Sequence, residues 1–226
     1  MRDLQIRQTS DGSHTLWVPN IKESFHSMHG AITESQHVFI ARGLKYLCQS
    51  SGKEEVSILE IGLGTGLNAL LTCCYSQEHQ QKVKYTALEP FPLSWELAGQ
   101  LNYTKQISHS QATFWFKELH KTTWGQIERL SPYFAILKKK ETIQDHAIVN
   151  QYDLCYFDAF APGKQPDIWD MKVLNIVRRS LKPSGVLVTY CAQGQFKRNL
   201  KELGFSVECL PGPPGKNEMT RAVLQD

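Results

Sequence analysis

The stretch VSILEIGLGTGLNALL, residues 56–71, decides the fold expected for this chain of 226 residues. It opens with an apolar run that favours a buried strand and closes with a run that favours a helix. Between them stand Gly62, Gly64 and Gly66, which permit positive φ angles and let the backbone approach a ligand closely. The free N–H groups at the start of the following helix would face the same ligand. The stretch therefore predicts a ligand-binding glycine loop.

The spacing of the glycines narrows the class of ligand. A dinucleotide-binding loop has the pattern G-x-G-x-x-G, and here Leu67 stands where its third glycine belongs. The pattern is G-x-G-x-G, with Glu60 two residues ahead, which argues against a bound pyrophosphate and a dehydrogenase. Glu89 ends the next expected strand, where an acid can accept hydrogen bonds from both hydroxyls of a ribose. A smaller nucleoside ligand is the better fit.

Strands and helices alternate from residue 56 onward, which predicts an α/β fold with a doubly wound, mostly parallel sheet and helices on both faces. Seven strands are expected, at residues 56–62, 83–89, 133–139, 152–157, 186–191, 205–210 and 220–224. The expected helices lie at residues 67–77, 92–101, 166–181 and 194–204. The last two strands are close enough in sequence to form a hairpin, so one antiparallel edge strand is expected. Residues 104–130 are expected to be irregular with some helix.

Residues 1–52 differ from the rest and are expected to form an N-terminal extension that frames the site, while residues 53–226 form the main domain. The segment 4–19 alternates around Asp11-Gly12 and predicts a hairpin. A helix should follow, with its cap within residues 33–35. His26 and His29 are spaced like a pair of metal ligands, but no carboxylate or cysteine cluster accompanies them, so no metal site is predicted.

Composition is that of an ordinary globular protein, with 41% hydrophobic and 21% charged residues and a net charge of +3. The slight positive charge is compatible with an anionic partner. No apolar stretch approaches the about 18 residues of a membrane span, and no signal-peptide core is seen, so a cytoplasmic location is expected. The six cysteines form no C-x-x-C pair and are interpreted as reduced core residues, without disulfides or zinc.

A second informative stretch is YDLCYFDAFAPGKQPDIW, residues 152–169, in which Asp158 directly follows an apolar strand. The carboxyl ends of parallel strands share one rim, so Asp158 should lie near Gly62 and Glu89. The loop is similar to the D/N-P-P-Y/F loops of amino-group methyltransferases, in which the acid and adjacent carbonyls accept hydrogen bonds from the target amine. The structural alternative is that Asp158 is a helix cap or ion-pair partner, although Asp167 is the better candidate to cap the next helix.

Four segments together carry a more specific resemblance: ESQHVFIARGL (34–44), LEIGLGTGLNALL (59–71), DLCYFDAFAPGKQPDIW (153–169) and GPPGKNEMTRA (212–222). They resemble the tRNA 5-methylaminomethyl-2-thiouridine methyltransferase family, which comprises the methyltransferase half of MnmC and its stand-alone MnmD-like relatives. The resemblance extends from about residue 24 to residue 223. It implies a Rossmann-like class I methyltransferase that uses S-adenosyl-L-methionine to methylate the aminomethyl group of the wobble uridine in the tRNA anticodon stem-loop.

The resemblance also implies a set of site residues. Asp158 is the catalytic candidate and, with six others, a cofactor-binding candidate: Glu60, Gly62, Gly64, Gly66, Asn68 and Glu89. Phe160 offers a face on which a base can stack, and Pro162 stiffens the loop. Lys164 and Lys216 complete the substrate-binding candidates. The chain is too short to hold the FAD-dependent oxidase domain of the bifunctional enzyme, so a separate oxidase is a candidate partner.

Basic residues offer weaker signals for RNA. Lys138 to Lys140, Arg178 with Arg179, and the group Lys197, Arg198 and Lys201 are compatible with phosphate contacts, although each group alone reads as a solvated face. Three alternatives remain open. One is a class I methyltransferase of a small amine or another RNA base. Another is an aminopropyl transferase, which usually carries additional acids around its glycine loop. The third is a non-catalytic RNA-binding protein.

Overall fold

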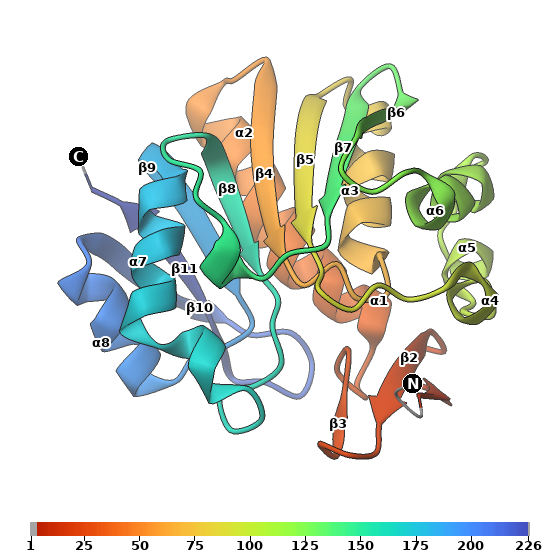
Figure 1. Cartoon of the computed structure of the whole chain (residues 1–226), viewed down its shortest axis with the longest axis horizontal. Helices are drawn as coiled ribbons and strands as arrows, with labels where there is room; N and C mark the ends of the chain where they lie inside the picture. Colours follow the sequence, from red (N-terminus) through yellow and green to blue (C-terminus); the bar gives the residue numbers. More distant parts are fainter. Residues whose placement is uncertain (1–3, 226) are drawn as a thin grey trace.

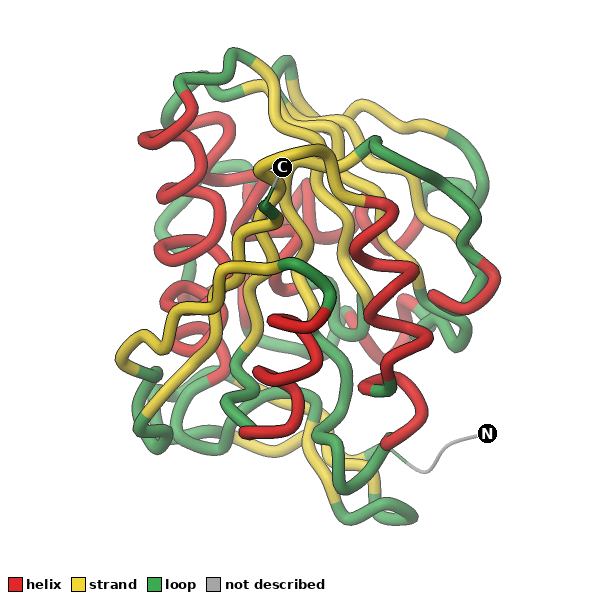
Figure 2. Tube along the Cα trace, turned by 90° about the vertical axis from the view of Figure 1, so that its left-hand side faces the viewer, coloured by secondary structure: helices red, strands yellow, loops and turns green. Residues whose placement is uncertain are grey.

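A computed structural model describes residues 4–225, and its centre is an eight-stranded sheet with helices on both faces (Figures 1 and 2). The strand order is β10-β11-β9-β8-β4-β5-β7-β6. A separate three-stranded sheet, in the order β1-β2-β3, lies at the lower edge in Figure 1, near the loops at the carboxyl ends of the central strands.

The strands of the large sheet are β4 (Glu55–Ile61), β5 (Lys82–Leu88), β6 (Ile127–Ser131), β7 (Phe134–Lys139), β8 (Tyr152–Phe157), β9 (Leu181–Thr189), β10 (Phe205–Pro211) and β11 (Glu218–Leu224). Those of the small sheet are β1 (Gln5–Gln8), β2 (His14–Val18) and β3 (Glu23–Ser24). The helices are α1 (Ala31–Ser35), α2 (Tyr46–Ser51), α3 (Leu67–Glu78), α4 (Trp95–Ala98), α5 (Tyr103–Gln106), α6 (Ala112–Lys121), α7 (Met171–Ser180) and α8 (Gly194–Glu202). The π-helical segment η1 (Gln36–Lys45) joins α1 to α2, and two 3-10 turns are η2 (Ile143–Asp145) and η3 (Pro166–Trp169).

The sheet divides the hydrophobic core into two layers, because successive side chains of a strand point to opposite faces. In β4, Ile58 packs into the layer that contains α3 and η1, and Leu59 packs into the layer that contains α7 and α8. Every residue of β8 is buried, which explains its unbroken apolar sequence. The strands β5, β4, β8 and β9 therefore form a rigid parallel platform whose carboxyl ends present the site.

The predicted α/β class with a doubly wound, mostly parallel sheet is confirmed, but the expected count of seven strands is wrong. The eighth strand is β6, which lies within residues 104–130 and pairs antiparallel with β7 through a tight turn. Its outer residues are exposed, so its sequence lacks an apolar run. The position of the antiparallel strand also differs from expectation. β11 runs antiparallel between β9 and β10, and the antiparallel edge strand is β6 at the opposite side.

The expected hairpin is present as β1 and β2, and its turn caps the first long helix. Ser13 Oγ accepts hydrogen bonds from the Ala31 and Ile32 N–H groups, at 3.2 and 3.3 Å, and Asp11 Oδ2 accepts one from Thr33 N–H at 3.0 Å. The expectation of a cap within residues 33–35 is wrong, because these residues lie inside the continuous helix from Ala31 to Ser51. The hairpin is thereby fixed to the main sheet through α1.

The expected helix at residues 166–181 is two elements, η3 and α7. Asp170 caps α7 by accepting a hydrogen bond from Val173 N–H at 2.9 Å, so the predicted role of Asp167 is wrong. Asp167 does not cap α7, and its side chain lines the cavity described below. Within residues 4–225, no helix has the length and apolar character to cross a membrane.

Candidate active site

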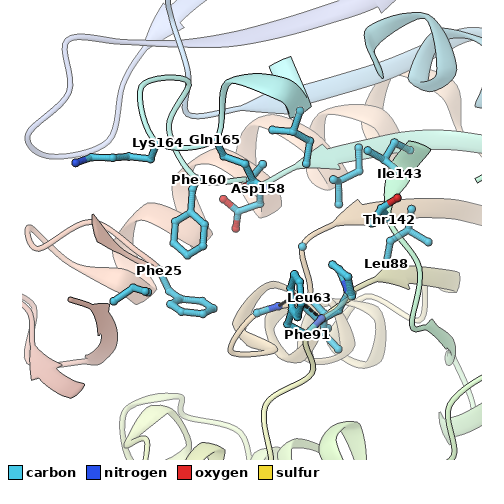
Figure 3. Close-up of a pocket in the computed structure, with 18 of the residues that line it drawn as sticks. Phe25, Leu63, Leu88, Phe91, Thr142, Ile143, Asp158, Phe160, Lys164 and Gln165 are labelled. Carbon is cyan, nitrogen blue, oxygen red and sulfur yellow. Dashed lines mark hydrogen bonds between the residues drawn. The ribbon is translucent and has the colours of Figure 1, made fainter. Parts of the chain in front are cut away.

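A cavity of about 550 Å³ opens at the carboxyl ends of β4, β5, β7 and β8 (Figure 3). Its walls come from five segments far apart in sequence: residues of the β2–β3 region (Val18, Asn20, Ile21, Phe25, His26), the glycine loop (61–65), the end of β5 (88–91), the segment after β7 (141–144) and the loop after β8 (158–160, 164, 165, 167, 168). The volume falls in the range of small-molecule sites. The sheet edge and the N-terminal hairpin thus share one cavity.

The glycine loop has the positive φ angles that its sequence predicts, namely 89° at Gly62, 50° at Gly64 and 76° at Gly66. Close approach of other chain segments explains these glycines further. A Cβ atom on Gly62 would lie 2.9 Å from the carbonyl oxygen of Asp158, and one on Gly64 would lie 3.0 Å from the Phe25 ring. These glycines are predicted to let a ligand approach, and in the structure the loop also packs against Asp158 and Phe25.

Glu89 lines the cavity and holds the glycine loop to the end of its own strand. Its Oε2 accepts a hydrogen bond from Gly64 N–H, and its Oε1 accepts one from Phe91 N–H, both at 2.9 Å. Two backbone donors hold the carboxylate as a charged acceptor at a fixed place. Glu89 therefore lies where the sequence analysis placed it, at the rim shared with Gly62.

Glu60 and Asn68 lie behind the cavity and connect to Asp158. Asn68 Nδ2 donates hydrogen bonds to Glu60 Oε1 at 3.0 Å and to Asp158 Oδ2 at 2.8 Å. Glu60 is completely buried, and this burial, together with the nearby Asp158 charge, raises the pKa of Glu60 well above its usual value. Neither Glu60 nor Asn68 lines the cavity. Their hydrogen bonds join Glu60, through Asn68, to Asp158 at the wall.

Asp158 is at the cavity wall, and its surroundings make it an unusual carboxyl. Burial raises the pKa of Asp158 to about 7, the Glu34 charge adds to this effect, and the Asn68 hydrogen bond and the Lys216 charge oppose it. A carboxyl poised near neutrality can both accept and release a proton under ordinary conditions. Figure 3 shows the carboxylate directed into the open space between Phe160 and the glycine loop.

The loop after Asp158 is held by two hydrogen bonds to its carbonyls. Tyr190 Oη donates to the Ala159 carbonyl, and Trp169 Nε1 donates to the Phe160 carbonyl, each at 2.8 Å. The resemblance to amino-group methyltransferases predicted that such carbonyls receive the amine, and each of these two carbonyls accepts one bond from the protein. The Asp158 carboxylate is the charged acceptor of the loop at the cavity wall.

The N-terminal segment contributes residues that the sequence analysis missed. Phe25 packs edge-to-face on Phe160, with ring centroids 5.2 Å apart. His26 Nε2 lies 2.7 Å from Thr65 Oγ1, and burial lowers the pKa of His26 to about 4. These contacts join segments that are distant in sequence, so no local sequence pattern predicts them. Phe91 and residues 141–144 were also missed, although each follows the carboxyl end of a predicted strand, which is the position that could have found them.

Several predicted residues lie outside the cavity wall. Gly66 begins α3 against His120, Pro162 is in the loop but does not line the cavity, and Lys216 forms an ion pair with Glu34. Lys164 does line the rim, and Figure 3 shows its amino group directed away from Asp158. Of the eleven site candidates, the wall contains Gly62, Gly64, Glu89, Asp158, Phe160 and Lys164.

The expectation that Lys138 to Lys140 could all contact phosphates is wrong for Lys138. It is almost fully buried, and its Nζ donates a hydrogen bond to the Leu119 carbonyl at 2.6 Å. Burial lowers the pKa of Lys138 to about 8. Lys138 therefore ties α6 to the sheet and does not offer a phosphate contact, while Lys139 pairs with Glu141 at 3.3 Å.

Comparison with known proteins places the chain among methyltransferases. Residues 102–225, more than half of the chain, match the family described as S-adenosyl-L-methionine-dependent methyltransferase. The chain belongs to this family. Within it, the sequence relatives of this methyltransferase are MnmC proteins, as the resemblance in sequence motifs indicated.

Two curated relatives are named tRNA 5-methylaminomethyl-2-thiouridine biosynthesis bifunctional protein MnmC. The protein of Cupriavidus necator is 28% identical over 90% of this chain and 32% of its own length. That of Burkholderia multivorans is 29% identical over 91% of this chain and 33% of its own length. The chain thus spans about a third of the relatives that it matches.

Solved structures support the fold. MnmC2 from Aquifex aeolicus superposes with a TM-score of 0.77 at 24% identity, covering 100% of this chain and 71% of that one. Spermidine synthase from Thermotoga maritima superposes with a TM-score of 0.55 at 13% identity, covering 99% of this chain and 72% of that one. The second likeness shows that a spermidine synthase has the same fold, so the fold alone does not indicate the reaction.

The charge of the cavity fits the cofactor of this methyltransferase family. Its wall carries four carboxyl groups (Glu89, Glu141, Asp158, Asp167), of which Glu141 is paired with Lys139, and one lysine, Lys164. An acidic cavity favours a sulfonium cation and opposes a pyrophosphate. Glu89 is oriented as an acceptor at the glycine loop, where ribose hydroxyls can donate to it. Among residues 4–225, no group of three histidine, cysteine or acidic side chains is arranged to hold a metal ion.

Proposed function

We propose that this methyltransferase transfers a methyl group to the amino nitrogen of 5-aminomethyl-(2-thio)uridine at the wobble position of tRNA. The observation that carries the proposal is the Asp158 carboxylate, which faces the same cavity as Gly62, Gly64 and Glu89. The names of the MnmC relatives support a tRNA uridine as the substrate.

The cofactor supplies a methyl group that is already activated by its sulfonium centre. The chain would hold it with the backbone of the glycine loop and with Glu89 at the ribose. Gly62 packs against the Asp158 carbonyl, so the cofactor-binding loop and the amine-binding loop are in direct contact. This contact fixes the direction from which the amine approaches, and positioning of this kind accounts for much of the rate of bimolecular transfers.

An alkyl amine is protonated near neutral pH and must lose a proton before its lone pair can attack. Asp158 is proposed to bind the ammonium and accept that proton. The nitrogen then forms its bond to the methyl carbon, while the electron pair of the carbon–sulfur bond returns to sulfur. Because burial raises the pKa of Asp158 to about 7, it is a better proton acceptor than an ordinary carboxylate. The proton can pass from Asp158 to solvent through the cavity mouth.

Two aromatic rings and one lysine suit a nucleotide substrate at the mouth. Phe160 is proposed to stack on the uracil ring, with Phe25 supporting it edge-on. Lys164, exposed at the rim, is proposed to meet a phosphate of the anticodon loop. The aminomethyl substrate is proposed to arise by oxidative removal of a carboxymethyl group, so an FAD-dependent oxidase, fused or separate, is a proposed partner.

The direct test is methylation in vitro. The purified chain is incubated with S-adenosyl-L-methionine and tRNA that carries 5-aminomethyl-2-thiouridine, and the digested nucleosides are analysed by mass spectrometry. The proposal requires conversion of the aminomethyl nucleoside to the methylaminomethyl nucleoside. Parallel reactions with decarboxylated S-adenosylmethionine and putrescine test the aminopropyl alternative. Product in that reaction, with none from the tRNA, would contradict the proposal.

A further inference from the structure

An ion pair between Glu34 and Lys216 lies outside the cavity wall. Lys216 Nζ is 2.5 Å from Glu34 Oε1, and the side chain of Glu34 is only 6% exposed. The other oxygen of Glu34 accepts a hydrogen bond from Ser27 N–H at 2.8 Å. Glu34 belongs to α1, whereas Lys216 belongs to the β10–β11 loop. Burying the Glu34 carboxylate is costly, and the pair with Lys216, whose side chain is 31% exposed, offsets this cost.

The position of Lys216 is fixed on its other side as well. The preceding residue, Gly215, has a φ of 83° and packs so closely on His29 that a side chain would collide with the imidazole. The Lys216 ammonium also lies 3.7 Å from the centre of the Tyr190 ring. The loop therefore contacts both α1 and the end of β9.

Further contacts connect this ion pair to the loop after β8, which carries Asp158. Tyr190, whose ring lies against Lys216, donates its hydroxyl hydrogen bond to the Ala159 carbonyl at 2.8 Å. Ala159 is the residue directly after Asp158. A chain of direct contacts thus runs from Glu34 through Lys216 and Tyr190 to the loop that carries Asp158, without any member lining the cavity.

The two charges of the pair act on Asp158 in opposite directions. Next to burial, the Glu34 charge is the strongest influence that raises the pKa of Asp158, and the Lys216 charge lowers it. Other polar and titratable groups around Asp158 come from β4, α3, β5 and β9, namely Glu60, Asn68, Tyr85, Glu89 and Tyr190. From the loop of Asp158 itself, Lys164 directs its amino group away.

We propose that Glu34 and Lys216 are a positioning pair for Asp158: their ion pair holds Lys216 against the Tyr190 ring, and Tyr190 in turn holds the loop that carries the carboxylate. The charges of the pair support this role, because Glu34 raises the pKa of Asp158 and Lys216 lowers it. Neither residue touches the amine. The ion pair with Lys216 and the hydrogen bond from Ser27 N–H hold the Glu34 carboxylate in place. The role of the pair in amine methylation rests on the proposed function, whereas its effect on Asp158 is a property of the chain alone.

The test measures the protonation of Asp158 directly, by carbon-13 NMR of protein labelled at the aspartate carboxyl carbons. The Asp158 signal is the one that Asp158→Asn removes. In Glu34→Gln, the midpoint of the Asp158 titration should fall by roughly 0.5–1 pH unit, the size expected for one charge at close range in a partly buried site. Adding Lys216→Met to Glu34→Gln should raise the midpoint again, and Lys216→Arg, which keeps the charge, should leave it unchanged.

A matched control is Glu208→Gln, which breaks the ion pair of Glu208 with Arg221 on β10 and β11, 2.8 Å long in the parent. It should leave the Asp158 midpoint where it is. An equal midpoint of the Asp158 titration in the parent, in Glu34→Gln and in the double variant would overturn the inference. A pair with a purely structural role could lower stability in these variants but would not move this midpoint.

Methylation assays separate this inference from the proposed function. In single-turnover reactions with the aminomethyl-uridine tRNA, the acid limb of the pH–rate profile should shift in Glu34→Gln by the same amount and direction as the NMR midpoint. A moved NMR midpoint with no methylation by the parental protein would contradict the proposed function and leave the inference standing. Normal methylation with an unmoved midpoint would overturn the inference alone.

Discussion

The side-chain amide of Asn68 donates a hydrogen bond of 2.8 Å to Asp158 Oδ2 and another of 3.0 Å to Glu60 Oε1. One side chain in the first turn of α3 thereby joins the acid before the glycine loop to the acid at the end of β8. Since Glu60 and Asn68 flank the loop in sequence, the shape of the loop and the position of Asp158 depend on each other.

Replacing Asn68 with leucine keeps a similar volume but removes both donors. We expect the free energy of unfolding to fall by about 1–3 kcal/mol, because two buried acceptors lose their partner. The pKa of Asp158 should rise further, since the Asn68 hydrogen bond lowers it. Urea denaturation and the acid limb of the pH–rate profile measure the two effects. Asn199→Leu on α8 is the control, and equal stability losses in both variants would contradict the role of Asn68.

Glu89→Gln keeps the size of the side chain but removes the charge that accepts hydrogen bonds from Gly64 and Phe91 N–H groups. If this carboxylate also binds the ribose hydroxyls, the affinity for S-adenosylhomocysteine should fall by about 1.5–3 kcal/mol. Isothermal titration calorimetry gives this value. Glu141→Gln, which also removes a carboxylate from the cavity wall, is the comparison. A loss of turnover with unchanged affinity in Glu89→Gln would speak against contact with the ribose.

Gly64→Ala should destabilise the protein for two separable reasons. The φ of 50° costs an alanine about 1 kcal/mol, and the new methyl group would lie 3.0 Å from the Phe25 ring. Adding Phe25→Leu should relieve the steric part and leave the backbone part. The double-mutant cycle, read by thermal unfolding and by S-adenosylhomocysteine affinity, measures the coupling. Strictly additive effects of Gly64→Ala and Phe25→Leu would show that Phe25 does not contact the glycine loop.

His120 should make stability depend on pH. Its Nε2–H donates to the Thr65 carbonyl at 3.1 Å, and burial lowers the pKa of His120 to about 4, whereas an unfolded histidine titrates near ~6.5. Between these values the unfolded chain binds a proton that the folded chain does not, so acid favours unfolding. Burial raises the pKa of Asp158 and Glu60, and these groups act in the opposite direction over part of the range.

The contribution of His120 is therefore measured as a difference between the parent and His120→Asn. Relative to His120→Asn, the free energy of unfolding of the parent should fall by about 2–3 kcal/mol from pH 7 to pH 4.5, because the lowered pKa of His120 favours the unfolded chain in acid. Urea denaturation at each pH gives the two free energies. A difference that is independent of pH would contradict a neutral buried histidine.

Much of the fold was predictable because the signals are local. The apolar runs of β4, β5 and β8 and the glycines between β4 and α3 set the parallel sheet, and the shared rim of parallel strands then brings Gly62, Glu89 and Asp158 to one cavity. β6 was missed because a five-residue strand with an exposed outer face carries no apolar run.

The parts of the site that could not be predicted depend on contacts between distant segments. Phe25 contacts Gly64 and Phe160 from the N-terminal segment, whose hairpin is joined to α1 by Ser13 and Asp11. Lys216 looked like a candidate for the substrate, but the fold pairs it with Glu34. The burial of Lys138 could not be predicted, because it belongs to a run of three lysines. The sequence alone does not distinguish a solvated amino group from one that donates a hydrogen bond to a buried carbonyl.

The most direct test of the account is single-turnover methylation of aminomethyl-uridine tRNA by the parent and by Asp158→Asn from about pH 6 to pH 10, the span around an amine titration. The asparagine keeps the shape of the loop but cannot accept the proton, so the rate should fall by about 10²–10⁴-fold near neutral pH. The defect should shrink as pH rises and more of the amine is already neutral. The parental rate should itself decline as pH falls through about 7, where the raised pKa of Asp158 lies. Asp167→Asn, a second carboxylate of the same wall, should retain most of the rate. A parental rate in Asp158→Asn across this range would show that the acid at the end of β8 only supports the loop, and would contradict the account.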